Sequence, residues 1–93
     1  MNIEDVFSSR LRMKILKILY DVAELNTSDF ARRLRVNYAS TSKHLKILEN
    51  EGILQHKMFG RICLYRYNEQ SAKAKAVQTM IQVWELENKN EKR

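Results

Sequence analysis

The apolar residues of this chain repeat with two different spacings, and the order of these spacings limits the fold. Three segments carry apolar residues three and four positions apart, as amphipathic helices do. Two short β-prone runs follow, ILQHKM and ICLYRY, and the glycine between them predicts a hairpin. A last segment, SAKAKAVQTMIQVWELEN, returns to helical spacing. The expected fold is therefore mainly α with a small β-hairpin, in the order helix, helix, helix, hairpin, helix.

Capping residues and glycines set the expected bounds of these elements. Ser8-Ser9, Asn26-Thr27 and Asn37 are N-cap candidates, and Gly52 ends the third helix as a left-handed residue would. A length of 93 residues allows one small domain, residues 1–93. Its expected parts are a prelude at 2–7, a first helix at 8–22, two helices at 28–51, a hairpin at 53–67, a last helix at 70–87 and a fraying tail, NKNEKR.

The positive charge is concentrated in the middle of the chain. The net charge is +6, and residues 32–66 alone hold eight cations against two acids. A concentrated basic stretch is typical of a protein with a polyanionic partner. The alternative is a solvated basic surface without a partner.

The order of elements predicts a helix-turn-helix at residues 28–51, followed by a wing, the hairpin at 53–67. In this geometry the third helix lies in the DNA major groove, and its N-terminal residues lead. Helical spacing turns Thr41, Leu45 and Leu48 toward the core. Small side chains let the backbone approach the bases, hydroxyls can bond to base edges, and lysines pair with phosphate or guanine. The predicted DNA-facing residues of this helix are Tyr38, Ala39, Ser40, Ser42, Lys43 and Lys46.

Further cations flank this helix on both sides. Arg61 follows Gly60 at the tip of the hairpin, where a phosphate or minor-groove contact is expected. Lys57 is a second candidate on the wing. Arg32 and Arg33 lie on the second helix, which crosses the DNA backbone in this geometry, so they either contact phosphate or are solvated.

Three motifs occur in a fixed order over roughly residues 6–68: RLRMKILKIL, then SKHLKILENEGIL, then Gly60-Arg61 with Tyr65. Together they resemble the winged helix-turn-helix regulators of the arsenical-resistance-repressor type (ArsR-like). The resemblance implies a homodimer that binds operator DNA and usually represses transcription. It also implies that the first and last helices form the dimer interface.

The chain departs from the family pattern at three places. The region ELNTSDFARRL lacks the cysteine pair of the metal sensors, which puts metal sensing in doubt. Arg35 stands where the family commonly has glycine, so this turn is expected to hold a strained residue or to be reshaped. Thr41 replaces an apolar residue of the recognition helix, and its hydroxyl should find a backbone partner.

The apolar stripes of the first and last helices exceed what so small an interior can absorb. Exposed apolar helix faces mark interaction surfaces, and a two-fold dimer is the simplest way to cover them. Such a dimer would place two recognition helices about one turn of DNA apart. The predicted interface residues are Leu11, Ile15, Val77, Met80, Ile81 and Trp84.

Other classes of site receive little support from the sequence. His44 is interpreted as a structural residue, and His56 with Cys63 on the opposite run falls short of a closed metal site. We predict no metal, no cofactor and no enzymatic activity, because no catalytic constellation is present. A redox role for Cys63 and a small effector stay open. The lone cysteine, the lack of a signal peptide and the lack of an apolar membrane segment favour the cytoplasm.

The sequence therefore predicts a cytoplasmic, homodimeric regulator that binds specific double-stranded DNA, more in keeping with a repressor than an activator. Two alternatives stay open. One is an architectural DNA-coating protein with little sequence preference. The other is a winged-helix module for protein contacts that uses the helix around Trp84.

Overall fold

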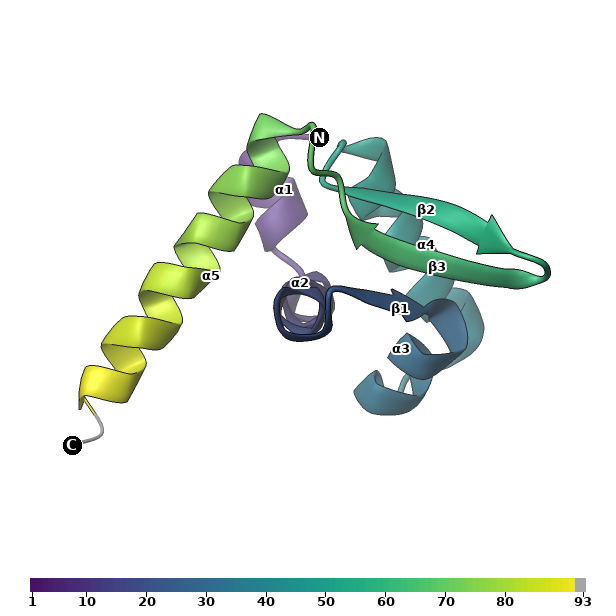
Figure 1. Cartoon of the computed structure of the whole chain (residues 1–93), viewed down its shortest axis with the longest axis horizontal. Helices are drawn as coiled ribbons and strands as arrows, with labels where there is room; N and C mark the ends of the chain where they lie inside the picture. Colours follow the sequence, from purple (N-terminus) through teal and green to yellow (C-terminus); the bar gives the residue numbers. More distant parts are fainter. Residues whose placement is uncertain (92–93) are drawn as a thin grey trace.

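The computed structural model describes residues 1–91, and its elements occur in the predicted order with one added strand (Figure 1). The prediction of a mainly helical fold with a small hairpin is confirmed. The elements are α1 Ile3–Phe7, α2 Arg10–Val22, β1 Glu24–Asn26, α3 Thr27–Leu34, α4 Tyr38–Asn50, β2 Leu54–Phe59, β3 Ile62–Tyr67 and α5 Ala72–Glu91.

Side-chain caps begin α2, α3, α4 and α5. The Ser9 hydroxyl accepts from the Arg12 amide at 3.2 Å, and the side chains of Asn26 and Asn37 each accept from the amide three residues on at 2.8 Å. These bonds satisfy amides that have no partner inside the helix. After α4, Gly52 has a φ of 79°, the left-handed conformation expected of a residue that ends a helix.

The strand β1 was not predicted. It pairs antiparallel with β3, with Leu25 opposite Tyr65, so that the sheet has the order β1-β3-β2. Three residues are too few to show an alternating pattern, and the last of them, Asn26, also caps α3. The link from α2 turns sharply through Ala23, whose φ is 68°.

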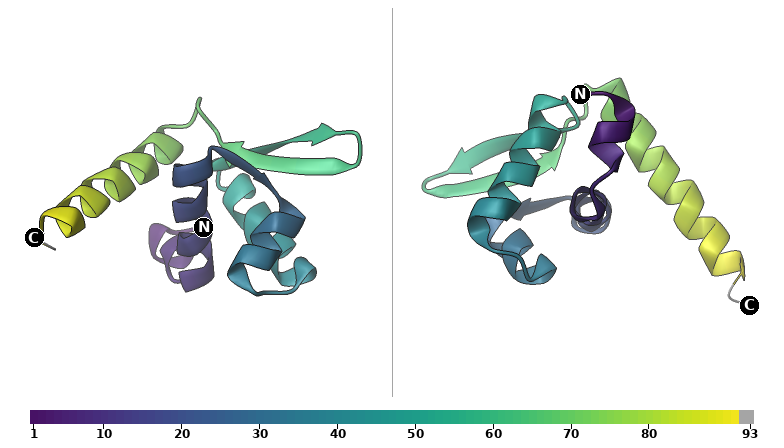
Figure 2. Two further views of the ribbon diagram at one scale, coloured as in Figure 1. Left: turned by 60° about the horizontal axis from the view of Figure 1, so that its bottom comes forward. Right: turned by 180° about the vertical axis from the view of Figure 1, so that it is seen from behind.

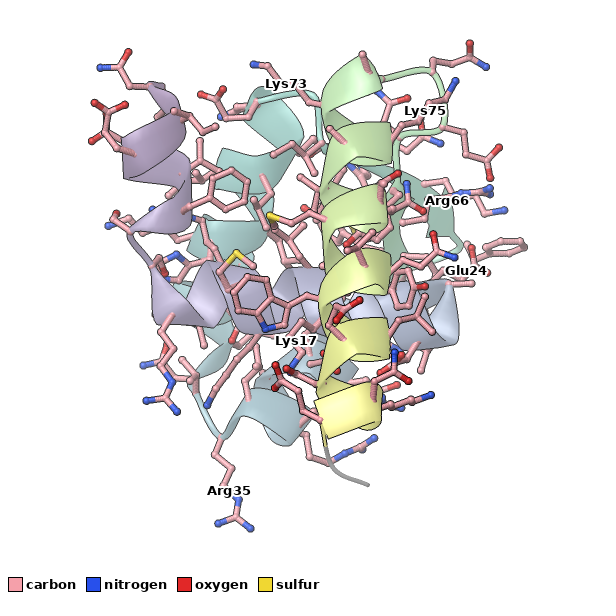
Figure 3. The ribbon with its side chains drawn as sticks, turned by 90° about the vertical axis from the view of Figure 1, so that its left-hand side faces the viewer. Lys17, Glu24, Arg35, Arg66, Lys73 and Lys75 are labelled. Atoms are coloured by element: carbon pink, nitrogen blue, oxygen red, sulfur yellow. The ribbon has the colours of Figure 1, made fainter. Side chains whose placement is uncertain are left out.

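The last helix continues beyond residue 87, the end that the sequence predicted. Residues 88–91, expected to fray, are helical, and the last two residues of the tail lie outside the described part of the chain. Figure 3 shows α5 lying across α2, and an ion pair of 3.3 Å between Lys17 and Glu85 joins the two helices. This contact helps to hold the C-terminal half of α5 against α2.

The core lies where α2, α3 and α4 meet the sheet. Its largest fully buried side chains are Ile15, Leu16, Leu19, Phe30, Thr41, Leu45, Leu48 and Leu54. Tyr67 closes the core from the sheet, where its hydroxyl donates to the carbonyl of Leu16 at 2.5 Å. Burial raises the pKa of Tyr67 far above its ordinary value. This bond ties the base of the hairpin to α2.

The molecule is elongated, with extents of 44 × 26 × 23 Å. Figure 2 shows the β2–β3 hairpin projecting beyond the helices on one side, while α5 extends away on the other. The hairpin and α5 therefore present separate surfaces at opposite ends of the long axis.

Candidate nucleic-acid interface

Helix α4 has two chemically different faces. Its inner face packs Thr41, Leu45 and Leu48 into the core, and the Thr41 hydroxyl donates to the carbonyl of Asn37 at 2.9 Å. The polar intrusion of Thr41 thus has the backbone partner that the sequence led us to expect. The other face is open: Tyr38, Ala39, Lys43 and Lys46 are exposed, and Ser40 and Ser42 are half-buried.

The turn that presents α4 contains the expected strained residue. Arg35 has φ 56° and ψ 43°, the left-handed conformation that glycine adopts most readily. Its amide donates to the carbonyl of Arg32 at 3.3 Å, which ends α3. The Arg35 side chain points away from the body of the molecule (Figure 3). Arginine therefore keeps the backbone shape that glycine would give and adds an exposed cation beside α4.

The two arginines of α3 differ in their surroundings. The guanidinium of Arg32 donates to Asp29 at 2.6 Å, so its charge is partly neutralised. Arg33 is exposed, and no acidic side chain pairs with it within residues 1–91. Arg33 is therefore the better placed of the two to meet an external anion.

The wing ends in a tight two-residue turn, Gly60-Arg61. Phe59 and Ile62 are opposite each other in the register, and Gly60 has a φ of 58° while Arg61 has a negative φ. This combination fits a type II′ turn, which suits the twist of a hairpin. Arg61 is exposed at the tip, and the Lys57 ammonium lies 5.0 Å from the centre of the Phe59 ring.

Lys43, Lys46, Lys57 and Arg61 share one electrostatic property. All four are exposed, and the ion pairs found in the described part of the chain involve other cations. Tyr38 at the start of α4 and Arg61 with Ile62 on the wing also line one shallow hollow of about 130 Å³. The start of α4 and the tip of the wing thus form one continuous surface with unneutralised positive charge.

A contact that the sequence did not reveal joins α4 to the wing. The Glu49 carboxylate accepts from the backbone amide of His56 at 3.1 Å and from the His56 ring nitrogen Nδ1 at 2.5 Å. The His56 ring lies 5.6 Å from that of Tyr65. Both bonds are non-local and join residues seven positions apart, so helical or strand periodicity could not indicate them. They connect α4 directly to strand β2 of the wing.

The register does not place the two residues that we considered as metal ligands on the hairpin directly opposite each other. His56 is opposite Tyr65, whereas Cys63 is opposite Met58 and packs against the core. Within residues 1–91, no three His, Cys, Asp or Glu side chains are grouped so that they could hold a metal ion. His56 instead serves the contact with Glu49.

A second unpredicted contact lies behind α4. Arg12 is buried, and its guanidinium donates to the carbonyls of Val6 at 3.0 Å and Asp5 at 2.7 Å. It also lies 3.0 Å from His44 Nδ1, which must accept because arginine is only a donor. Burial, and then the nearby Arg12 charge, lower the pKa of His44 below its ordinary value. The structural role predicted for His44 is this link between α4 and the α1–α2 corner.

One signal in the sequence could have indicated that Arg12 is buried. Residue 12 lies three, four and seven positions before Ile15, Leu16 and Leu19, which are all fully buried. It therefore belongs to the core stripe of α2. An arginine on such a stripe calls for internal acceptors, and the carbonyls of α1 provide two of them.

The predicted interface residues on α2 and α5 divide into two groups. Ile15 is fully buried, and Val77 and Ile81 are nearly so, because they pack inside the protomer where α5 crosses α2. Ile15 therefore has no surface to offer a partner, and its assignment to the interface is corrected. Leu11 is half-buried, whereas Met80 is 43% and Trp84 68% exposed. Val83 and Leu86, which were not in the predicted set, are also exposed.

Comparison with known proteins identifies the family to which the chain belongs. The profile described as bacterial regulatory protein, arsR family, matches residues 9–56, which is about half of the chain. The chain belongs to the arsR family of bacterial regulatory proteins. The resemblance seen in the sequence is thereby confirmed. A family of regulators also agrees with the prediction that the chain is not an enzyme.

The chain is also similar to a bacterial regulator over part of its length. The chain is 31% identical over 65 residues to the uncharacterized HTH-type transcriptional regulator YdgJ of Bacillus subtilis (strain 168). That match covers 67% of this chain but 40% of YdgJ, so the chain spans less than half of this relative.

Two solved structures show the same fold. A homodimeric winged helix-turn-helix DNA-binding domain from Mycobacterium bovis is 20% identical, with a TM-score of 0.74 over 89% of this chain and 74% of that one. The transcriptional repressor PagR of Bacillus anthracis is 21% identical, with a TM-score of 0.70 over 86% of this chain and 85% of PagR. The fold is therefore that of a winged helix-turn-helix protein. No helix within residues 1–91 is both long enough and apolar enough to cross a membrane.

Proposed function

We propose that this arsR-family chain is a transcriptional regulator that binds specific double-stranded DNA as a homodimer. The observation that supports it best is the surface formed by the outer face of α4 and the wing, with four exposed cations that form no ion pair within residues 1–91. The recognition helix enters the major groove, and the wing contacts the backbone or the minor groove. The chain acts as one domain, residues 1–93, in the cytoplasm.

The surface divides into residues for affinity and residues for selectivity. Lys43, Lys46, Lys57, Arg61 and Arg33 pair with phosphates, which makes affinity fall as the salt concentration rises. The side chains that select the sequence are Tyr38, Ala39, Ser40, Ser42 and Lys43. Tyr38 is the largest of these and is 57% exposed at the leading end of α4.

The second half of the proposal is a two-fold dimer formed by α5 and α2. Met80 and Trp84 line a hollow of about 310 Å³ together with Met13 and Lys17 of α2. The exposed side chains of Val83 and Leu86 extend the apolar surface along the same helix. Large exposed apolar patches are uncommon on a monomer, and a second copy would cover this one. The homodimeric relative from Mycobacterium bovis supports this assembly, and PagR supports the role of a repressor.

The experiment that tests DNA recognition is selection from randomised duplexes at near-physiological salt, followed by sequencing. We expect an enriched inverted repeat whose half-sites lie about one helical turn apart. Duplexes retained without any enriched sequence would instead support an architectural DNA-coating protein. If no duplex is retained, the DNA-binding proposal is wrong and the α5 surface becomes the candidate for a protein partner.

Sedimentation equilibrium at micromolar concentration tests the dimer separately. We expect a dimer for the native chain and a shift toward monomer for Trp84→Ser, because this side chain lies outside the protomer core. The matched control is Lys75→Ser, which removes an exposed side chain near the other end of α5 (Figure 3). A native chain that stays monomeric would remove the homodimer from the proposal.

A further inference from the structure

The tip of the wing is more apolar than a surface that only contacts phosphates needs to be. Met58, Phe59 and Ile62 are 56%, 58% and 51% exposed. They surround the Gly60-Arg61 turn at the end of a hairpin that projects beyond the helices (Figure 2). Within residues 1–91, no other segment covers these three side chains. Exposed apolar groups gathered at one place mark a binding surface.

The apolar side chains are arranged as a pair on one face of the hairpin. Phe59 and Ile62 are directly opposite each other in the strand register, so both side chains leave the same face of the two-stranded ribbon. The turn between them is only two residues long, which makes the tip narrow. A narrow tip that carries two adjacent apolar side chains has the form of a wedge.

Charge and position indicate what the wedge meets. The Lys57 ammonium lies 5.0 Å from the centre of the Phe59 ring, and Arg61 is exposed in the turn itself. Ile62 and Arg61 also line the same hollow as Tyr38 at the start of the recognition helix. The apolar tip is flanked by cations and is continuous with the proposed DNA surface. Duplex DNA fits this combination, because its phosphates are anionic and its stacked base pairs are apolar.

We propose that the wing tip is an apolar wedge that inserts Phe59 and Ile62 between neighbouring base pairs from the minor groove and bends the duplex. Proteins that bind the minor groove use phenylalanine, isoleucine and methionine in this way, and the partial unstacking kinks the duplex toward the major groove. Arg61 enters the groove beside the wedge, and Lys57 neutralises a phosphate at its edge. Steps that unstack easily, such as TA and CA/TG, are then preferred where the wing contacts the DNA. This inference rests on the proposed function and adds to it a second means of selecting sequence.

The exposed apolar surface of α5 differs in shape and charge from the wing tip. The apolar side chains of Val83, Trp84 and Leu86 lie along a helix at the other end of the long axis. That surface is broad and suits another helix, whereas the wing tip is narrow and flanked by cations. The two patches therefore suit different partners, a second copy of the chain and DNA.

The test measures bending and base unstacking on a duplex recovered by the selection experiment. If selection enriches no sequence, a retained A·T-rich duplex serves as the probe. A donor and an acceptor dye at the two ends report the bend, and 2-aminopurine at the step under the wing reports unstacking. The native chain is expected to bend the duplex by roughly 20–90° and to raise the 2-aminopurine fluorescence.

Variants separate the wedge from general binding. In the double variant Phe59→Ser with Ile62→Thr, we expect several-fold weaker binding, a straight duplex and no rise in fluorescence. Phe59→Leu keeps an apolar tip and should retain most of the bend. Gln55→Ser changes an exposed residue near the base of the wing and should behave as the native chain does. All of these side chains are exposed, and unchanged thermal midpoints would verify that folding is intact.

The outcomes distinguish the wedge from the proposed function. A native chain that binds the duplex but leaves it straight and stacked overturns the wedge and leaves DNA recognition standing. The wedge is also overturned if the double variant bends the duplex as strongly as the native chain. Failure of the native chain to bind any duplex overturns the proposed function itself.

Discussion

Leu45 and Lys46 are neighbours in the chain, yet they lie on the two opposite faces of α4. Leu45 is fully buried among the core side chains, whereas Lys46 is exposed and carries an unpaired charge. The side chains of the inner face hold the helix against the core. The side chains of the outer face do not contribute to this packing, so they can suit the DNA sequence that is bound. One helix thus divides its residues between stability and recognition, and substitutions on the two faces should have separable effects.

The largest expected effect is on the inner face. Leu45→Ala removes a fully buried side chain and leaves a cavity, so the free energy of unfolding should fall by about 2–5 kcal/mol. Urea denaturation followed by circular dichroism measures it. Under conditions where the variant stays folded, its salt slope for DNA binding should match that of the native chain. A Leu45→Ala variant with native stability would contradict the assignment of this face to the core.

A smaller effect is expected one residue away, on the outer face. Lys46→Ala should weaken binding to every duplex by about 1.5 kcal/mol, because one charge-assisted contact to phosphate is lost. The slope of log affinity against log salt should flatten by about 1 for each protomer. Fluorescence anisotropy at several salt concentrations measures both, and Lys75→Ala on α5 is the matched control. An unchanged slope with Lys46→Ala would remove Lys46 from the phosphate contacts.

The turn before α4 is expected to affect both stability and DNA binding, because Arg35 has a strained backbone and an exposed positive charge. Arg35 is in the left-handed conformation, which costs a residue with a Cβ about 1 kcal/mol relative to glycine. Arg35→Gly should relieve this strain, offset in part by the greater freedom of glycine in the unfolded chain. We expect a modest rise in the midpoint of thermal unfolding together with weaker DNA binding, since an exposed cation is lost. Arg35→Asn, which tolerates the same conformation, separates the two contributions.

The smallest expected effect concerns His44, at the boundary between the two faces. Burial and Arg12 lower its pKa in the folded state, so the unfolded chain takes up a proton first as the pH falls. This contribution to stability is complete above the ordinary histidine pKa and is lost as the pH falls through the lowered one. Urea denaturation at about pH 7.5 and about pH 5.5 should show a smaller difference for His44→Gln than for the native chain.

The control for this pH effect is His56→Gln on the wing. That variant leaves the contact between Arg12 and His44 intact, so it should keep the part of the pH dependence that His44 causes. If His44→Gln and His56→Gln changed the pH dependence equally, the effect could not be assigned to the Arg12 contact.

Local signals in the sequence were sufficient for most of the fold. Asn26 and Asn37 act as caps, Gly52 is left-handed, and Arg35 is strained, and each of these depends on a few neighbouring residues. Features that depend on distant residues could not be read in this way. Strand β1 exists because β3, some forty positions later, offers it an edge.

The candidate site shows the same division. The exposure of Tyr38, Lys43 and Lys46 follows from helical geometry alone. The bonds of Glu49 to His56, and of Arg12 to His44 and the carbonyls of α1, depend on how separate elements meet. The partners in these bonds are histidine rings and backbone groups, whose positions in the sequence follow no periodic pattern. The predicted interface failed at Ile15 because a stripe of apolar residues does not tell how much of it the protomer itself covers.

Strand β1 has a mechanical consequence. One residue, Ala23, separates it from the end of α2, and it pairs along β3, so the base of the wing is joined to α2 by backbone hydrogen bonds rather than by a flexible loop. Tyr67 adds a side-chain bond between the same two elements. We therefore expect the wing and α2 to move together as one rigid unit. In a dimer held through α2 and α5, a small rotation at the interface would appear as a larger displacement at the two wing tips.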